Sequence, residues 1–379
     1  MDFNLTKQQL LMKDLFDEFS LKVVKPIAAE VDEKEMFPVD TVKKFKEYGF
    51  LGIPFPKKYG GSGASDLEYV MCVESLSKHC ATSGVIVSAH TSLGANPIMM
   101  YGNEVQKEKF LIPLASGKKL GAFGLTEPNA GTDAAGQQTY AVDDGDHYIL
   151  NGSKIFITNG GYADIYIIFA MTDKSKGTRG ISAFIVESTT AGFEIGKKEL
   201  KLGIKGSATT ELIFKDCIIP KENLLGKEGD GFKIAMKTLD GGRIGIAAQA
   251  LGIAQGALDE TVKYVKERKQ FNRPISAFQN TQFMLANMAT QIEAARLLVY
   301  KAAMLKSEKK PYSDAAAKAK LFASETAMDV TTKCVQLFGG YGYTREYPIE
   351  RMMRDAKITE IYEGTSEVQR MVISASLLK

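Results

Sequence analysis

The sequence predicts an α+β protein of three consecutive domains: a helical domain over residues 1–118, an antiparallel β domain over 119–226 and a helical bundle over 227–379. Apolar residues recur at helical spacing in the first and last parts of the chain. The middle part is instead a series of short segments rich in β-branched and aromatic residues, with turn signals between them. A chain of 379 residues is also too long for one ordinary hydrophobic core.

The helical character of the first domain begins near the amino terminus. Thr6 and Gln9 have the spacing of a capping box, which predicts a helix that starts directly after Thr6. The residues that follow are apolar at helical spacing, namely Leu11, Leu15, Phe16 and Phe19.

A hairpin is predicted in the first half of the middle domain. Residues 140–152 form two short apolar-rich segments around a turn centred on Asp144-Gly145. The segments IFITN, IYIIFAMTD, GISAFIVE and TTELIFKDCIIP follow it. Several short strands in one block favour an antiparallel sheet or a small barrel.

Three long helices are predicted after Gly231. Residues 247–271 and 276–308 are amphipathic, and a third helix runs from Ser313 to Phe338, where two glycines stop it. Long helices with short connections make a bundle. Small residues at spacings that allow close helix approach are Gly245, Gly252 and Gly256.

Charge and hydropathy exclude two classes of protein. The net charge is +3, whereas a dedicated nucleic-acid binder carries a basic stripe or tail. The longest uncharged apolar run, residues 165–171, is far short of the roughly 18 residues that span a bilayer. The first 19 residues contain acidic side chains and an amphipathic pattern that a signal peptide lacks. We expect a cytoplasmic protein that binds neither nucleic acid nor membrane.

The cysteines and histidines indicate no metal site. The four cysteines lack CxxC spacing, so free thiols are favoured over disulfides. The three histidines are scattered without ligand-like spacing, which argues against a metal centre or a histidine-based triad.

The polar loop over residues 123–136, FGLTEPNAGTDAAG, opens the β domain. It is either a linker or a set of backbone and hydroxyl donors for a ligand at a domain junction, where pockets tend to form. No GxGxxG or GxxxxGK[ST] motif is present, so a Rossmann or P-loop site has no support.

The stretch ITEIYEGTSEVQR, residues 358–370, places three carboxylates close together, in what reads as a strand end turning into a helix. Ser366 and Gln369 have capping-box spacing, so the last helix is expected to begin at Ser366, with Glu367 favoured in its first turn. Glu360 is expected to face solvent. Glu363 lies between an aromatic residue and a glycine, so it is either a desolvated general base or a solvated loop residue.

Five motifs together resemble the acyl-CoA dehydrogenase family over nearly the whole chain. They are FGLTEPNAGTD, KIFITNGG, RKQFNRPISAFQ, QLFGGYGY and IYEGTSEVQR, in the family's order and approximate spacing. The sequence is most similar to short-chain, butyryl-CoA-type members. The resemblance implies an N-terminal helical domain, a middle β domain and a C-terminal four-helix bundle.

The resemblance also implies the reaction: a dehydrogenation of an acyl-CoA across Cα–Cβ that depends on FAD. By position, Glu363 resembles the base that takes the α-proton while a hydride leaves Cβ for flavin N5. The main-chain N–H of Glu363 and a hydroxyl of FAD are the implied donors to the thioester oxygen. The implied partner is an electron-transferring flavoprotein, and the implied assembly is a homotetramer, a dimer of dimers.

The binding residues are implied in the same way. Those that resemble FAD contacts are Phe123, Leu125, Thr126, Thr132, Phe156, Thr158, Arg268, Gln279, Gln336, Gly339, Gly340, Thr365 and Glu367. Among them, Gln336, Gly339 and Gly340 resemble contacts made across a subunit boundary. Those that resemble acyl-CoA contacts are Thr132, Asp240, Arg243 and Gly364, where a side chain would crowd the thioester.

Three positions are informative beside the family pattern. Phe156 stands where many members have tryptophan, and Asn272 stands where glycine is usual, a change that positive φ tolerates best in asparagine. Isovaleryl-type members carry their base at the position of Gly242. The glycine there, together with Glu363, favours the butyryl-type placement.

Other activities remain compatible with these motifs. A reductase of acryloyl-CoA or crotonyl-CoA would use the same site in the reverse direction. An acyl-CoA oxidase would reoxidise the flavin with O2, although such enzymes usually carry a further C-terminal domain. A flavin-binding electron-transfer subunit with an inert acyl site is the alternative from another class.

Overall fold

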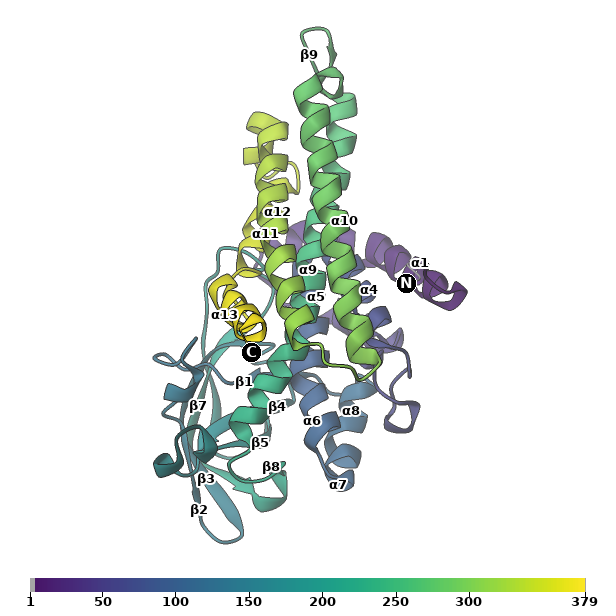
Figure 1. The fold of residues 1–379 in the computed structure, drawn as a ribbon. Helices are drawn as coiled ribbons and strands as arrows, with labels where there is room; N and C mark the ends of the chain where they lie inside the picture. The colour runs from purple at the N-terminus through teal and green to yellow at the C-terminus, as the bar shows by residue number, and fades with distance from the viewer. Residues whose placement is uncertain (1–3, 379) are drawn as a thin grey trace.

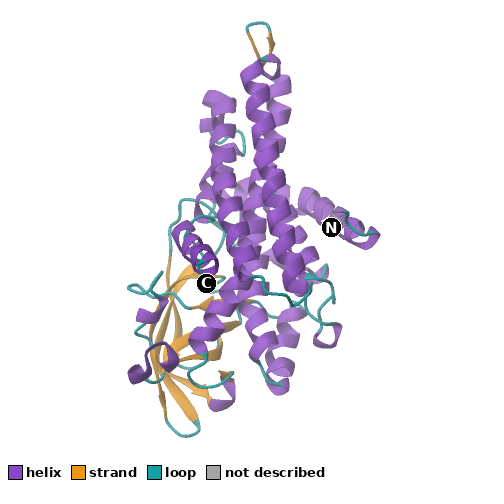
Figure 2. Ribbon diagram, viewed as in Figure 1, coloured by secondary structure: helices purple, strands orange, loops and turns teal. Residues whose placement is uncertain are grey.

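An eight-stranded sheet lies at one end of an elongated molecule, and long helices run away from it (Figure 1). The structure is a computed structural model that describes residues 4–378. Figure 2 shows the large sheet on one side of the helices and a small two-stranded hairpin at the opposite tip. Within residues 4–378, none of the helices combines the length and apolar character needed to cross a bilayer.

The first part of the chain is helical, as predicted. Its α-helices are α1 (Lys7–Phe19), α2 (Ala28–Glu33), α3 (Val39–Glu47), α4 (Asp66–Ser77), α5 (Ala81–Ser88), α6 (Asn96–Tyr101), α7 (Glu104–Gln106) and α8 (Ile112–Ala115). The capping box is confirmed, because Thr6 Oγ1 accepts from Gln9 N at 3.2 Å and Gln9 Oε1 accepts from Thr6 N at 2.9 Å. Phe16 and Phe19 are buried, whereas Leu11 and Leu15 remain exposed.

The strands of the middle part form one sheet in the order β6-β7-β3-β2-β4-β5-β8, with β1 beside β4. They are β1 (Gly121–Gly124), β2 (Tyr140–Asp143), β3 (His147–Thr158), β4 (Ile165–Met171), β5 (Ile181–Glu187), β6 (Phe193–Lys198), β7 (Thr209–Pro220) and β8 (Leu224–Leu225). The predicted hairpin is β2–β3, and Gly145 in its turn has φ +79°. The sheet is not purely antiparallel: β1 pairs parallel with β4, because the long connection between them contains the whole β2–β3 hairpin.

The continuous apolar run of β4 follows from burial on both faces of the sheet. Ile165, Ile167 and Phe169 pack against a cluster that includes Ile234 of the following helix. Tyr166 and Ile168 on the other face join a second cluster, whose members all come from the middle part of the chain. A strand covered on both sides has no solvent face to mark with polar residues.

The last part of the chain is helical, with α9, α10 and α11 side by side (Figure 1). Its elements are α9 (Gly231–Glu267), β9 (Lys269–Gln270), β10 (Arg273–Pro274), α10 (Gln279–Ser307), α11 (Ser313–Phe338), α12 (Ile349–Ile358) and α13 (Ser366–Leu377). The predicted bounds of α11 are confirmed. The helix predicted over 247–271 starts earlier, at Gly231, and ends earlier, at Glu267. It ends there because the chain turns back between β9 and β10, where Phe271 and Asn272 take φ of +51° and +60°.

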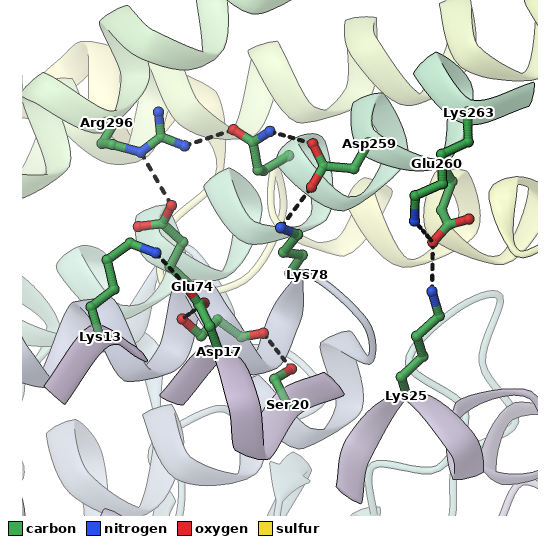
Figure 3. A network of polar contacts seen from close by, with 12 residues as sticks. Lys13, Asp17, Ser20, Lys25, Glu74, Lys78, Asp259, Glu260, Lys263 and Arg296 are labelled. Carbon is green, nitrogen blue, oxygen red and sulfur yellow. Dashed lines mark hydrogen bonds and ion pairs between the residues drawn. The ribbon is translucent and has the colours of Figure 1, made fainter. Parts of the chain in front are cut away.

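The helical parts at the two ends of the chain are packed against each other. A Cβ atom added at Gly252 or Gly256 would lie 2.2 Å or 2.0 Å from carbonyl oxygens of Glu74 and Lys78, so these glycines let α9 approach the α4 region closely, as expected. Figure 3 shows polar contacts across the same junction. Arg296 Nε lies 3.2 Å from Glu74 Oε1, and the Lys78 ammonium pairs with Asp259.

Candidate active site

Glu363 lies in a short left-handed loop between α12 and α13. Its φ is +53°, and that of the following Gly364 is +92°. Positive φ is costly for glutamate, so the surroundings must hold the loop in place. Gln369 Nε2 donates to the Gly364 carbonyl at 2.8 Å and to the Glu363 carbonyl at 3.3 Å. Lys320 Nζ donates to the Gly364 carbonyl at 2.8 Å.

The Glu363 side chain is half-buried and largely removed from water. Its Oε2 atom is buried and has no hydrogen-bond partner among the described residues. Burial raises the pKa of Glu363 to about 8, although the positive charges of Lys320 and Arg243 act in the opposite direction. A carboxyl group with a pKa near the operating pH is suited to proton transfer. The expectation of a desolvated acid at this position agrees with the geometry.

Gly242 of α9 makes the space that this carboxyl occupies. A Cβ atom at Gly242 would lie 1.9 Å from Glu363 Oε2 and 2.9 Å from Leu93 Cδ2. No Cβ atom is tolerated at such a distance. The carboxyl of the last loop therefore occupies the place that a side chain at 242 would need.

A cavity of about 200 Å³ opens beside Glu363. Three parts of the chain line it: α5 with the π-helical segment Ala89–Ala95, the edge of the sheet with its first loop, and α9 with the Glu363 loop. The predicted site residues that it brings together are Phe123, Leu125, Thr126, Thr132, Phe156, Thr158, Arg243, Glu363 and Gly364. Phe156 is 58% exposed and has φ +59°.

The polar loop after β1 is held by a buried ion pair. Lys154 of β3 is fully buried, and its Nζ lies 2.7 Å from Glu127 Oε1 and 3.2 Å from the Leu125 carbonyl oxygen. Glu127 also accepts from the main-chain N–H of Thr139. The main-chain N–H of Ile155 donates to the Thr126 carbonyl at 2.9 Å. The loop is therefore a fixed wall of the cavity, which the linker interpretation does not explain.

A second cavity, of about 580 Å³, lies near the end of α11. It is lined by Arg268, Gln336, Gly339 and Gly340 from the predicted set, with Tyr264 and Tyr341 as aromatic neighbours. The Arg268 guanidinium lies over the Tyr341 ring, 5.4 Å from its centroid. These four residues are far along the bundle from Glu363, so the structure separates the predicted set into two places.

The remaining predicted residues line neither cavity. Asp240 accepts from Arg243 Nη1 at 2.7 Å and from Ser313 Oγ at 2.8 Å, so it orients Arg243. Gln279 is exposed at the start of α10. Thr365 caps α13, and Glu367 is exposed in the first turn of that helix.

Three local expectations for this stretch are corrected. The last helix begins at Ser366 as predicted, but its cap is Thr365, which accepts from Val368 N. Gln369 instead turns inward to the loop carbonyls. Glu360 is not fully solvent-facing, since it is half-buried and paired with Lys357 at 2.6 Å. The residues before the loop belong to α12 and turns, where a strand end was expected.

Models of acyl-CoA dehydrogenase domains match most of the chain. The N-terminal domain matches residues 6–118, the middle domain 122–217 and the C-terminal domain 229–378. The chain belongs to the acyl-CoA dehydrogenase family. The predictions of family, three-part fold and enzyme class are thereby confirmed, whereas the domain boundaries 118/119 and 226/227 stay predictions.

Individual relatives of this acyl-CoA dehydrogenase family member cover its full length. The short-chain specific acyl-CoA dehydrogenase of Clostridium acetobutylicum is 64% identical over 100% of both chains. The acryloyl-CoA reductase (NADH) of Anaerotignum propionicum is 51% identical over 100% of this chain and 96% of its own.

Solved structures agree with this. The butyryl-CoA dehydrogenase of Megasphaera elsdenii has a TM-score of 0.99 and 58% identity over 100% of both chains. A chain solved in work on the electron transferring flavoprotein of Acidaminococcus fermentans and flavin-based electron bifurcation has a TM-score of 0.99 and 62% identity over 100% of both chains. An acyl-CoA dehydrogenase of Bacillus anthracis complexed with FAD has a TM-score of 0.93 and 35% identity, covering 99% of this chain and 67% of its own.

The residues present fit a flavin cofactor. The first cavity combines the open aromatic face of Phe156 with the hydroxyl-bearing Thr126 and Thr158. The second cavity offers the cationic Arg268 beside the two glycines after α11, which suits a diphosphate. Sequence reasoning missed Lys154, Glu127 and Lys320, the buried charges that hold these walls, because buried and exposed charges look alike in sequence.

Proposed function

We propose that this chain catalyses the FAD-dependent α,β-dehydrogenation of a short-chain acyl-CoA, butyryl-CoA to crotonyl-CoA, or the reverse reduction. The observation that carries the proposal is the Glu363 carboxyl, whose Oε2 atom is buried without a hydrogen-bond partner among residues 4–378 and which borders a cavity. Relatives along the full length of the chain are named for short-chain acyl-CoA and butyryl-CoA substrates.

In this proposal Glu363 acts as the base in dehydrogenation. As carboxylate it takes the α-proton of the thioester, and burial makes it a stronger base than an exposed glutamate. Lys320 and Arg243 place positive charge near it, which keeps part of the population ionised at neutral pH. In the reverse reaction the protonated Glu363 returns the same proton to Cα.

When bound, FAD supplies the acceptor for the hydride that leaves Cβ. We assign its ring to the wall made by Thr126, Phe156 and Thr158. We assign the surroundings of Arg268, which lie in the other cavity, to the diphosphate of the FAD held by a neighbouring subunit of the proposed tetramer. Gly364 keeps the space next to the base clear of a side chain, so a thioester can approach the loop. The main-chain N–H of Glu363 as a donor to the thioester oxygen stays a prediction.

The test is anaerobic titration of the flavin-loaded enzyme with butyryl-CoA while the FAD absorbance is followed. The wild-type enzyme should lose its oxidised flavin absorbance. Glu363→Gln should retain FAD and acyl-CoA binding but reduce its flavin about 10³-fold more slowly, since a general base contributes roughly 10²–10⁴-fold.

Glu367→Gln is the matched control. Glu367 is exposed, four residues along the chain, and outside the cavity. Because Glu367 belongs to the predicted FAD contacts, Glu367→Gln should lower FAD retention, whereas flavin reduction per bound FAD should stay within about threefold of wild type. Normal reduction by Glu363→Gln, or equal losses in both variants, contradicts the assignment of the base.

The proposed electron partner is an electron-transferring flavoprotein, supported by the similarity to the chain solved in work on that protein of Acidaminococcus fermentans. We further propose a homotetramer, a dimer of dimers, and a cytoplasmic location. Steady-state assays with the purified flavoprotein, and mass determination in solution, test the partner and the assembly.

The second candidate is an enoyl-CoA reductase. It is favoured by the 51% identity to an acryloyl-CoA reductase over the whole chain. Glu363 serves both directions, so the residues do not separate them. Rates measured in both directions with the natural electron partner separate the two candidates. A reductase gives a higher kcat/KM with crotonyl-CoA or acryloyl-CoA than with the corresponding saturated acyl-CoA.

A further inference from the structure

A buried lysine stands behind the Glu363 loop. Lys320 of α11 has 0% exposure, and its Nζ donates to the Gly364 carbonyl oxygen at 2.8 Å. Burial of an ammonium group is costly unless it is paired with polar or charged groups. Lys320 does not line the cavity, so a direct contact with substrate does not account for its position.

The loop that Lys320 contacts needs support. Two consecutive residues have positive φ, and one of them is a glutamate. The Gly364 carbonyl accepts from both Lys320 and the buried Gln369, which belong to different helices. These two donors hold the carbonyl from two directions and so fix the peptide next to the base.

Lys320 is also one of two cations near the Glu363 carboxyl. The other is Arg243 of α9, which is already engaged by Asp240 at 2.7 Å. The phenol groups of Tyr69 on α4 and Tyr362 are close and neutral, because burial raises the pKa of each. Burial lowers the pKa of Lys320 to about 8, while the carboxylates of Glu363, Glu360 and Glu367 act in the opposite direction, so the ammonium charge is present at pH 7. Of these two cations, Arg243 is thus ion-paired, whereas no carboxylate oxygen among residues 4–378 lies within 4.0 Å of the Lys320 ammonium, which donates to the Gly364 carbonyl instead.

We propose that Lys320 is a positioning residue of the reaction, which holds the Glu363–Gly364 peptide through the Gly364 carbonyl and places a positive charge beside the Glu363 carboxyl. This inference rests on the proposed role of Glu363 as the base. Lys320 lies outside the cavity, yet in this proposal it determines both the orientation of the Glu363 carboxyl and the pH range in which that carboxyl is ionised.

The sign of the effect follows from the charges. Burial raises the pKa of Glu363, and Lys320 opposes this rise more than Arg243 does. Removal of the Lys320 charge therefore raises the pKa of Glu363 further, and less of the carboxylate is present at pH 7. An arginine at this position keeps the charge at every accessible pH.

The experiment compares Lys320→Met, Lys320→Arg and the control Lys318→Met. Lys318 lies on the same helix and forms a partly exposed pair with Asp314. Flavin reduction by butyryl-CoA is followed anaerobically from pH 6 to 9.5. In parallel, the Glu363 carboxyl band is titrated by infrared difference spectroscopy against Glu363→Gln, which requires no turnover.

Lys320→Met should reduce flavin at least tenfold more slowly at pH 7 and recover as the pH rises. The midpoint of both the rate and the infrared band should move upward by about one pH unit, a tenfold change in the ionised fraction. Lys320→Arg should have a midpoint at or below that of wild type, and Lys318→Met should be unchanged.

An unchanged midpoint in Lys320→Met refutes the role of Lys320. If Glu363→Gln is inactive in the same experiments, the proposed base still stands. Full activity of Glu363→Gln refutes the proposed base itself, so the two failures are distinguishable. If Lys320→Met does not fold, Lys320→Arg decides, because a midpoint above that of wild type contradicts the electrostatic role.

Discussion

Gly242→Ala tests the claim that the Glu363 carboxyl occupies the space that a side chain at position 242 of α9 would need. The added Cβ atom would lie 1.9 Å from Glu363 Oε2, whereas real Cβ contacts do not fall below 3.0 Å. The oxygen must therefore retreat by the difference, at least about 1.1 Å. The added methyl group cannot avoid this oxygen by shifting toward Leu93, because Leu93 Cδ2 would lie only 2.9 Å from the Cβ atom.

This movement of the carboxyl group should lower the rate of flavin reduction. A misplacement of about 1 Å at a reacting group lowers a rate by roughly 10²-fold, equivalent to about 2.7 kcal/mol of barrier. The carboxyl group is the end of a flexible side chain, so the fold should tolerate the change. We expect FAD content and melting temperature close to wild type, together with flavin reduction by butyryl-CoA about 100-fold slower.

Anaerobic stopped-flow absorbance measures this rate directly. Gly241→Ala is the matched control, because its Cβ atom would meet the Lys306 side chain at 3.5 Å and Asn96 Nδ2 at 4.0 Å, both ordinary contacts. A normal reduction rate in Gly242→Ala with FAD bound would refute the reasoning. It would mean that the productive position of Glu363 differs from the one described here.

Two further predictions concern stability. The pKa of Glu363 is about 8 in the folded chain and 4.5 as its ordinary value, so stability decreases as the pH rises from about 4.5 to 8 while the folded state resists ionisation. Glu363→Gln should therefore melt above wild type at pH 8, with a difference that shrinks toward pH 5; the reverse trend in scanning calorimetry contradicts this. Lys154→Met leaves the Glu127 carboxylate buried alone and should lower the free energy of unfolding by about 3–5 kcal/mol and weaken FAD retention. The double variant with Glu127→Gln should recover much of that loss in urea unfolding, and a double variant that is less stable than Lys154→Met would show that the pair does not act as one unit.

The sequence predicted those elements whose signals are local. The capping box at Thr6 and the bounds of α11 follow from neighbouring side chains and were confirmed. The parallel pairing of β1 with β4 could not be predicted in this way, because it depends on a connection of some forty residues. The predicted end of α9 was wrong, because the apolar spacing typical of a helix continues in the sequence up to Phe271, whereas the chain turns at Phe271 and Asn272.

The candidate site shows the same division. Glu363 could be singled out from its neighbours, since an aromatic residue and a glycine flank it. Lys320 could not, because it lies 43 positions away on a helix whose other lysines are solvent-facing or paired at the surface. Its role comes from the packing of α11 behind the loop.

The glycines of α9 bear on how the chain can be divided. At Gly252 and Gly256, main chain meets main chain between segments more than 170 positions apart, and nothing larger than a hydrogen atom fits there. If the chain were cut at the limits of the family's domains, each fragment would lose the helix that it packs against at these glycines. The main chain at the contact would then be exposed to water. The first and last parts should accordingly melt in a single transition, and neither should survive as a separately expressed fragment.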